Sequence, residues 1–302
     1  MASRYRRNSS AKRGSVYERV TARIVDQLQR GVQPWFQQWA SGGPVSAYPL
    51  RSTGERYQGI NVVLLYLTAQ EAGYRAAHWF TFKQAQALGG YVRAGERGTE
   101  VVYASQYRPK DKETGEEGQA VNFLKAYNVF NFEQCDGLPE RFRPAPPVQP
   151  GDDVRPIDQA ERFFGAIPAR IVPGNRACYN RLTDTVTMPP LASFVDAEFY
   201  YSTLAHELAH WTAHASRLNR EWKAKRWGDE GYALEELVAE MGAAFTMAAI
   251  GLEGRPREDH ASYLASWLGV LKQDSRAIFA AASAASKASE YLYRWQDAAV
   301  TV

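Results

Sequence analysis

The sequence predicts an α+β protein of two domains, the first a mixture of helices and strands and the second organised around a pair of helices. Its 302 residues suffice for two domains of ordinary size. Residues 144–150 hold four prolines, which neither a helix nor a central strand accommodates. Residues 1–150 hold 20 Lys and Arg against 13 Asp and Glu, a charge of +7, whereas residues 151–302 hold 16 against 20, a charge of −4. We therefore expect a proline-rich linker over residues 144–153, between one domain at 15–143 and another at 154–302.

The N-terminal domain is expected to begin with a helix. Residues 1–14 are basic and have no apolar run behind them, which indicates a flexible basic arm and not a secretory signal. The pattern Ser15-Val-Tyr-Glu18 is a capping box, typical of a helix start. Apolar residues then recur at helical spacing and predict a buried face, made by Val20, Ile24 and Leu28.

Further helices and strands complete this domain. Residues 59–73 are mostly apolar and end in a glycine, typical of a buried helix with a C-terminal glycine cap. Thr81-Phe-Lys-Gln84 is a second capping box and opens a short helix. Residues 91–103 predict a β-hairpin with strands at 91–93 and 99–103, and residues 122–131 alternate as another strand.

The C-terminal domain is predicted to place a strand before two helices. Residues 180–188 alternate in the manner of a strand. The first helix runs from the N-cap candidate Asp196 to about His214 without Gly or Pro. The second covers residues 232–247 and carries carboxylates at i and i+4 spacing.

The first of these helices contains His206-Glu-Leu-Ala-His210, an H-E-x-x-H pattern. Residues i and i+4 lie on one helix face about 6 Å apart, so both imidazoles reach one ion at the roughly 2.0–2.1 Å of Zn–N bonds. Glu207 stands beside them, placed to accept a proton from water. The helical context favours a metal-dependent hydrolase over a chance match.

A third ligand must come from another part of the chain. A metzincin has a histidine six residues after the second histidine of the motif, and this chain has Ser216 there. His214 lies about 12 Å along the helix axis from His206, too far to share its ion. We interpret His214 as exposed or as a partner of a ligand.

The second helix offers that ligand. Its first acids, Glu235 and Glu236, fall 25 and 26 residues after His210, which is the gluzincin arrangement. We favour Glu236 as the ligand, with Glu235 as its competitor because a sequence does not specify helix rotation so finely. Glu240, one turn later, is expected to orient a histidine.

Hydrolysis at such a site also needs a substrate platform and a donor for the transition state. The strand at 180–188 is a candidate edge strand for an extended peptide. Tyr232, His260 and Tyr263 are unranked donor candidates. Imidazole and carboxylate suit several divalent ions, so Zn²⁺ is favoured but Mn²⁺ and Co²⁺ stay open.

The N-terminal domain combines aromatic and basic side chains, as proteins that bind single-stranded nucleic acid do. Bases stack on aromatic rings for about 1–3 kcal/mol each, and Lys and Arg meet the phosphates. The candidates for such contacts are Trp35, Trp39, Tyr57, Trp79, Lys83 and Arg93.

Composition excludes several other classes. The chain has no run of 18 apolar residues, so no transmembrane helix is expected. Cys135 and Cys178 form no Cys-x-x-Cys pair, which predicts free thiols and a reducing cytoplasm.

Long blocks of the sequence resemble the plasmid-borne ArdC antirestriction proteins. Residues 16–105 are similar to their N-terminal domain, which is shared with TraC-type plasmid primases, and the back half is similar to their metallopeptidase domain. The matching blocks are GVQPW (Gly31–Trp35), YQGINVVLL (Tyr57–Leu65), HWFTFKQAQALGG (His78–Gly90), VRAGERGTEVVY (Val92–Tyr103), YNVFN (Tyr127–Asn131), HELAHWTAH (His206–His214), RLNR (Arg217–Arg220) and YALEELVAEMGAAF (Tyr232–Phe245).

The resemblance implies a single-stranded-DNA-binding module joined to a zinc-dependent, zincin-like peptidase that shields plasmid DNA during conjugation. It implies a metal triad of His206, His210 and Glu236. The motif itself makes Glu207 the expected catalytic base, and a host protein is the substrate expected of such a peptidase. Two alternatives stay open: a DNA-binding shield with a structural metal site, and a replication accessory, although no primase catalytic segment is visible.

Overall fold

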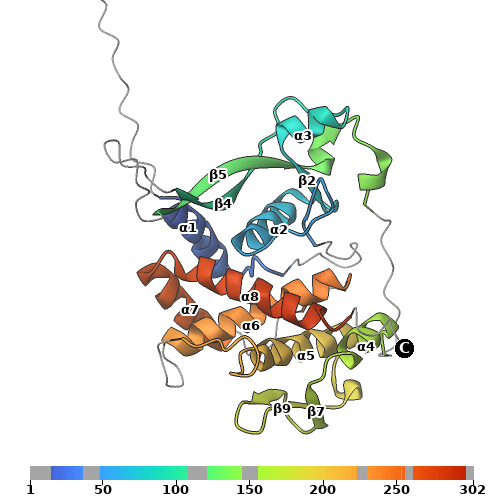
Figure 1. Ribbon diagram of the computed structural model, residues 1–302, viewed down its shortest axis with the longest axis vertical. Helices are drawn as coiled ribbons and strands as arrows, with labels where there is room; N and C mark the ends of the chain where they lie inside the picture. Colours follow the sequence, from blue (N-terminus) through green and yellow to red (C-terminus); the bar gives the residue numbers. More distant parts are fainter. Residues whose placement is uncertain are drawn as a thin grey trace, which may run out of the picture.

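The computed structural model describes residues 15–36, 48–107, 121–144, 156–222, 230–252, 254–255 and 261–296 (Figure 1). The predicted basic arm and residues 145–153 of the predicted linker lie outside these ranges. Figure 1 shows the elements in layers. The sheet that contains β4 and β5 covers α1 and α2, these lie on α6, α7 and α8, and α5 separates the last group from a second sheet with β7 and β9.

The three predicted helices of the N-terminal half are confirmed. Helix α1 (Val16–Gln29) starts at the Ser15 capping box and buries the predicted face. Helix α2 (Ile60–Ala72) is buried nearly all round and ends at Gly73, whose φ of 74° is the left-handed conformation that glycine adopts without strain. Helix α3 (Phe82–Ala87) starts at the Thr81 capping box.

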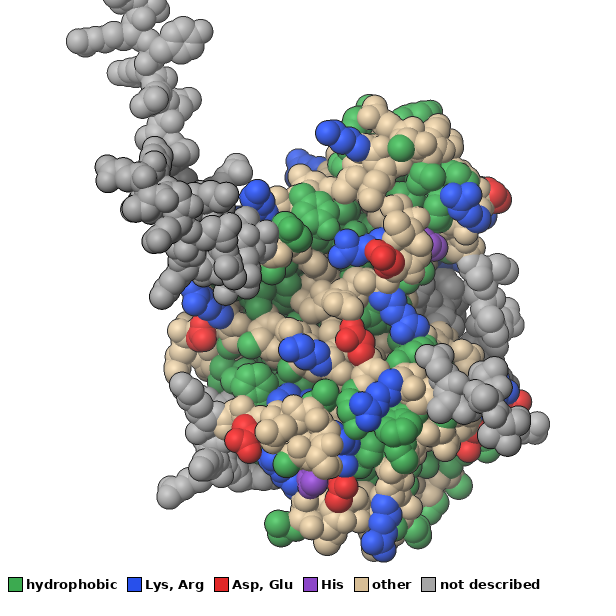
Figure 2. Space-filling model, viewed as in Figure 1, with side chains coloured by type: hydrophobic (Ala, Val, Ile, Leu, Met, Phe, Trp, Pro, Cys, Tyr) green, Lys and Arg blue, Asp and Glu red, His purple; other side chains and the backbone are tan. Residues whose placement is uncertain are grey.

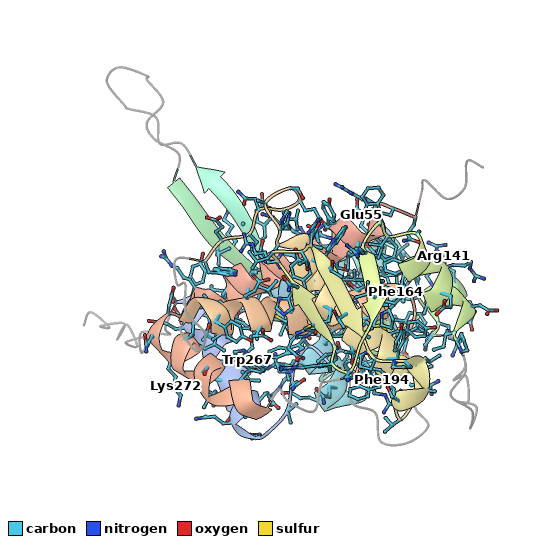
Figure 3. The ribbon with its side chains drawn as sticks, turned by 90° about the horizontal axis from the view of Figure 1, so that it is seen from below. Glu55, Arg141, Phe164, Phe194, Trp267 and Lys272 are labelled. Carbon is cyan, nitrogen blue, oxygen red and sulfur yellow. The ribbon has the colours of Figure 1, made fainter. Side chains whose placement is uncertain are left out.

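The first sheet has the strand order β1-β2-β5-β4, with β1 (Leu50–Arg51) parallel to β2 (His78–Phe80). Strands β4 (Thr99–Tyr107) and β5 (Val121–Asn131) pair antiparallel over nine residues and extend beyond the helices as a ribbon (Figure 3). Asn61 of α2 reaches the free edge of β4, where its side chain accepts from Val102 N at 2.7 Å and donates to Val102 O at 2.8 Å. This amide occupies backbone groups that an edge strand otherwise leaves open.

The predicted hairpin within residues 91–103 is wrong. Strand β3 (Tyr91–Val92) pairs with β6 (Cys135–Asp136), and β4 pairs with β5 instead. The long register of β4 with β5 offers more hydrogen bonds than a short local hairpin. Two 3-10 turns, η1 (Phe132–Gln134) and η2 (Glu140–Phe142), flank β6.

The C-terminal half begins with α4 (Asp158–Gly165) and a three-stranded sheet of order β7-β9-β8. Strand β7 (Arg170–Pro173) is parallel to β9 (Thr185–Met188), and β8 (Cys178–Asn180) is antiparallel to it. The single strand predicted at 180–188 is therefore two strands joined by a turn. Because β9 lies between two neighbours, its edges are filled, and it offers no edge for a substrate.

Four long helices follow the 3-10 turn η3 (Leu191–Ser193): α5 (Ala197–Thr212), α6 (Glu230–Ala249), α7 (Ala261–Gln273) and α8 (Ala277–Tyr293). Asp196 caps α5 as predicted, since its carboxylate accepts from Phe199 N at 2.6 Å. Both cysteines are free, as predicted. Among the residues that the structure describes, no helix is both long and apolar enough to cross a membrane.

One hydrophobic cluster spans the two predicted domains, and a second cluster lies within the C-terminal one. The rings of Trp35 and Trp267 meet edge to face at 5.8 Å, across the junction of the two halves. Trp267 belongs to α7 and is labelled in Figure 3. Thr21 donates to Ser275 O at 2.7 Å across the same junction. The cluster joins apolar side chains from α1 and α2 to others from α6, α7 and α8, among them Ile24, Val62, Leu65, Leu237, Met241, Phe245 and Ile278. Helix α6 is thus held between the N-terminal half and α5.

Candidate metal centre and nucleic-acid interface

Helices α5 and α6 bring the metal-ligand candidates together because they approach closely. A Cβ built on Gly242 of α6 would stand 3.1 Å from the Cβ of Ala209 on α5, a contact tighter than side chains ordinarily make. Ala209 directly precedes His210, so the contact is next to the site. Small residues at this crossing let the two backbones approach.

His206, His210 and Glu236 offer three ligand atoms that all lie within 4.8 Å of one another. The Nε2 atoms of the two histidines are 3.2 Å apart. Glu236 Oε2 is 3.6 Å from His206 Nε2, and Glu236 Oε1 is 3.5 Å from His210 Nε2. Two ligands at Zn–N distance around a tetrahedral ion are separated by about 3.3 Å. The three donors are therefore already spaced for a divalent ion.

The charges at this centre agree with that interpretation. Burial by itself lowers the pKa of His210, but the carboxylates of Glu236, Glu235 and Glu207 outweigh it and raise the pKa to about 9. Burial favours the neutral form of Glu236, yet the two histidines lower its pKa to about 2. The cluster thus gathers negative charge around a position where a cation is favoured.

The other acids of this region occupy separate positions. Glu207 is buried, and its charge acts on His210. Glu240 Oε1 lies 3.7 Å from His206 Nδ1, the ring nitrogen that is not among the candidate ligand atoms at short range from Glu236. Glu235 Oε1 lies 3.3 Å from His210 Nδ1 and is not part of the three-residue cluster.

Of the two donor candidates that the structure describes, Tyr232 and Tyr263, Tyr232 is the one that contacts Glu236. Its hydroxyl is 3.2 Å from that of Tyr263 and hydrogen-bonds the Glu236 carboxylate. Burial raises the pKa of Tyr232 far above its ordinary value, so the hydroxyl keeps its proton. His260 lies outside the described residues. His214 bonds Ser216 Oγ at 2.8 Å within its own turn, apart from the cluster.

Most aromatic residues expected at a nucleic-acid interface are core residues. Trp35, Tyr57 and Trp79 are only 1–3% exposed, so a base cannot reach their rings in this structure. Trp39 lies outside the described residues. Among the residues of this half whose side chains the structure describes, the large exposed aromatic ones are Phe82, Tyr91 and Tyr103, at 50–59% exposure. The sequence pattern does not separate the two groups, because only burial distinguishes them.

Lys83 is exposed, next to Phe82 at the start of α3. Tyr103 on β4 stands directly opposite the exposed Lys125 on β5. Each pair combines an aromatic ring with a cation, the combination that stacks bases and meets phosphates. On the face seen in Figure 2, Lys and Arg side chains are distributed among hydrophobic and polar surface, with acidic residues close to several of them.

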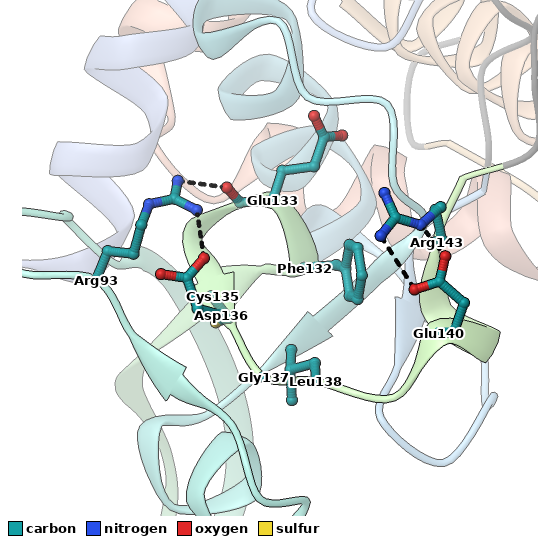
Figure 4. A pocket seen from close by; sticks show the side chains of 9 residues that line it. All are labelled: Arg93, Phe132, Glu133, Cys135, Asp136, Gly137, Leu138, Glu140 and Arg143. Atoms are coloured by element: carbon teal, nitrogen blue, oxygen red, sulfur yellow. Dashed lines mark hydrogen bonds and ion pairs between the residues drawn. The ribbon is translucent and has the colours of Figure 1, made fainter.

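Arg93 lines a hollow of about 370 Å³ with Arg143 at its other side (Figure 4). Arg93 donates to Glu96 at 2.8 Å and to Asp136 at 3.4 Å. Arg143 pairs with Glu140, with a second bond at 3.0 Å. Since each guanidinium has an acidic neighbour, the hollow is a poor place for phosphate.

Comparison with known proteins relates both halves of the chain to one kind of protein. Residues 14–130 match the N-terminal domain of anti-restriction factor ArdC, and residues 158–284 match a zincin-like metallopeptidase. The crystal structure of the antirestriction protein ArdC from the R388 plasmid, in its metal-free form, is similar with a TM-score of 0.82 at 42% identity. The similarity covers 94% of this chain and 99% of that one. The chain belongs to the ArdC antirestriction family.

Other relatives extend this result. The Mn(II)-bound structure of R388 ArdC has a TM-score of 0.77 at 41% identity, over 94% of this chain and 98% of that one. The uncharacterized protein y4eC of Sinorhizobium fredii is 36% identical over 291 residues, 93% of this chain and 92% of that protein. The DNA primase TraC of Escherichia coli is 36% identical over 302 residues, 93% of this chain but 20% of the primase. This ArdC-family protein thus spans only a fifth of that larger relative.

Proposed function

We propose that this ArdC-family protein binds single-stranded DNA through its N-terminal half, hydrolyses a protein substrate at a divalent metal in its C-terminal half, and protects plasmid DNA during conjugative transfer in the cytoplasm. The observation that carries the enzymatic part is the convergence of His206, His210 and Glu236 beside Glu207. A relative that was crystallised with Mn(II) supports a divalent ion, and Zn²⁺ is our first choice among such ions.

His206, His210 and Glu236 would hold the ion. A divalent ion bound by three protein ligands acts as a Lewis acid and makes a bound water more acidic. Glu207 takes the proton of the attacking water and passes it to the leaving amine. The Tyr232 hydroxyl keeps its proton and hydrogen-bonds Glu236, and we infer that it leaves Glu236 to donate to the oxygen on which charge develops.

The DNA part rests on exposed side chains and on charge. The N-terminal half carries the excess of Lys and Arg, and its exposed aromatic residues stand beside cations at Phe82–Lys83 and Tyr103–Lys125. We infer that these pairs contact DNA and that Trp35, Tyr57 and Trp79 support the surface from the core. Arg93 contributes less to DNA binding because its guanidinium is already paired with Glu96 and Asp136.

A second function is favoured by burial of the metal centre. The candidate ligands His206 and Glu236 are buried, and a closed coordination shell is typical of a structural ion. In that alternative the protein is a DNA-binding shield, or a replication accessory like the part of TraC that it resembles, with no hydrolysis.

Plasmid transfer into a restricting recipient separates these functions. The experiment compares wild type, Glu207→Gln, and a Phe82→Ala/Tyr103→Ala double variant, with Glu221→Gln as an exposed control of equal charge change. If hydrolysis is the function, Glu207→Gln loses protection while it still binds Zn²⁺ and single-stranded DNA. Full protection by Glu207→Gln would instead establish the shield.

The double variant tests the DNA surface. Loss of two stacking residues at about 1–3 kcal/mol each weakens oligonucleotide binding by at least tenfold. Unchanged affinity of a folded double variant would place the DNA elsewhere on the molecule.

A further inference from the structure

The ring of His210 contacts a different carboxylate through each of its nitrogens. Nε2 lies 3.2 Å from His206 Nε2 and 3.5 Å from Glu236 Oε1, inside the candidate metal centre. Nδ1, on the opposite edge, lies 3.3 Å from Glu235 Oε1. The neighbouring acids Glu235 and Glu236 on α6 therefore face the same imidazole from two sides.

Glu235 is held in place by two further side chains. Arg220 donates from Nη2 to Oε1 at 2.6 Å and from Nε to Oε2 at 2.8 Å, a two-pronged contact of fixed geometry. Trp222 donates from Nε1 to Oε2 at 2.9 Å. Both oxygens of Glu235 are thus engaged, and the carboxylate cannot turn to the metal centre without breaking these bonds.

Arg220 is itself anchored to the end of α5. It donates from Nη2 to Ala209 O at 2.8 Å and from Nη1 to Thr212 Oγ1 at 3.1 Å. Its backbone N–H bonds Ala213 O at 3.1 Å, after a turn in which Asn219 has a φ of 45°. The arginine therefore satisfies a carbonyl near the helix end and brings a positive charge there, both of which are favourable.

The surroundings of this network make its contacts effective. The Arg220 side chain is 8% exposed and that of Glu235 is 19% exposed. Both oxygens of Glu235 accept hydrogen bonds from the Arg220 guanidinium, so the carboxylate is paired with a cation inside the protein. Charge-assisted contacts of this kind are strong and hold the acceptor in one orientation toward the imidazole.

We propose that Glu235, clamped by Arg220, is a positioning residue for His210: it accepts the Nδ1–H and so presents Nε2 to the metal. This inference rests on the proposed metal site and assigns a role to the acid that competes with Glu236 in the sequence. Carboxylates on the far nitrogen of ligand histidines fix the ring and its tautomer. The loop after α5 thereby becomes part of the metal centre although it supplies no ligand.

The first test is Mn²⁺ binding by the full-length protein, with free Mn²⁺ measured by electron paramagnetic resonance. Glu235→Gln should weaken binding about 10- to 100-fold, the range known for such partners of ligands. Arg220→Lys keeps the charge but not the two-pronged contact, so its Mn²⁺ affinity should lie between those of wild type and Glu235→Gln. The control is Glu221→Gln, which removes an equal charge from an exposed position in the same loop and should bind like wild type.

A second measurement needs no metal. In protein labelled with [¹⁵N]histidine, the Nδ1–H of His210 should be protected from exchange with water, and the protection should disappear in Glu235→Gln. A residue that only connects α5 to α6 would lower thermal stability without changing this signal. If the Nδ1–H of His210 is protected in folded Glu235→Gln as strongly as in wild type, the proposal is overturned.

The outcomes also separate this inference from the function on which it rests. Wild-type protein that binds neither Mn²⁺ nor Zn²⁺ overturns the metal site and the positioning role together. Wild-type protein that binds Mn²⁺, with Glu235→Gln equally tight, overturns the positioning role alone.

Discussion

Replacing Trp35 tests whether the two halves of the chain are one cooperative unit. The indole is 1% exposed and meets Trp267 edge to face at 5.8 Å across the junction. An aromatic side chain buries about 150–250 Å², worth about 4–6 kcal/mol at 25 cal/mol per Å², and truncation of such residues to alanine costs about 3–5 kcal/mol. We expect Trp35→Ala to destabilise by about 3–5 kcal/mol.

Trp35→Phe is the matched variant. It keeps an aromatic ring for the edge contact and removes an indole N–H that has no hydrogen-bond partner among the described residues. Its cost should stay below the roughly 3 kcal/mol at which full truncation begins, because most of the ring is kept and only a small cavity forms.

The assay is thermal unfolding of the metal-free protein, followed by circular dichroism and by calorimetry. For a chain of this size about 2 °C of melting temperature corresponds to 1 kcal/mol, so Trp35→Ala should lower one single transition by about 6–10 °C. Single-stranded DNA affinity of folded Trp35→Phe should equal that of wild type. Two separate transitions, of which the substitution shifts only one, would refute the shared core, and weakened DNA binding by Trp35→Phe would restore Trp35 as a stacking residue.

Three further predictions concern the metal centre and the sheet. Gly242→Ala should destabilise the protein by about 1–3 kcal/mol and weaken Mn²⁺ binding, because the new Cβ would meet the Cβ of Ala209 at 3.1 Å. The control Gly269→Ala on α7, which has open space around it, should be neutral or slightly stabilising. Equal effects of the two variants in calorimetry and Mn²⁺ titration would contradict this prediction. The free energy of unfolding of the metal-free protein should be greatest between about pH 4.5 and 6.5. Because the His210 pKa is raised to about 9, the stability that this residue contributes is lost as the pH rises toward 9. Because the Glu236 pKa is lowered to about 2, the stability that this residue contributes is lost as the pH falls toward 2. Denaturant titrations across this range check the prediction, and His210→Gln should abolish the alkaline loss. Asn61→Ala should lower the free energy of unfolding by about 1–3 kcal/mol for each of the two Val102 backbone groups that lose the Asn61 amide. Urea unfolding measures this loss, with Asn128→Ala at an exposed position as the control variant.

The hydrophobic cluster connects the candidate metal centre to the N-terminal half of the chain. Helix α6 carries Glu236 toward α5, while Leu237, Met241 and Phe245 of the same helix belong to the cluster that reaches the N-terminal half. A cut in the proline-rich segment would expose this apolar surface on both pieces. Experiments on the metal centre are therefore better done on the full chain than on a separated C-terminal half.

Several features of this protein follow from the sequence alone because they depend on neighbours within one or two helical turns. The capping boxes at Ser15 and Thr81 form as predicted, since each involves residues three apart. His206 and His210 share a face because four residues make about one turn of helix. The family resemblance is confirmed over both halves for the same reason, because its blocks are contiguous stretches of chain.

Tertiary structure decided the rest, because each of those features depends on distant parts of the chain. The rotation of α6 on α5 selects Glu236 for the metal cluster and gives Glu235 to Arg220, a choice between adjacent residues that periodicity cannot make. Trp35 is a core residue because it is buried against α7, and it offers no ring face for a base. Its residue type and its neighbours in the sequence would suit either role. Strand β4 pairs with β5 rather than with the nearby β3, since nine pairs of residues outweigh a short local turn. The two histidines of the candidate metal centre are thus determined locally within α5, whereas the third candidate ligand, Glu236, depends on how α6 packs against α5.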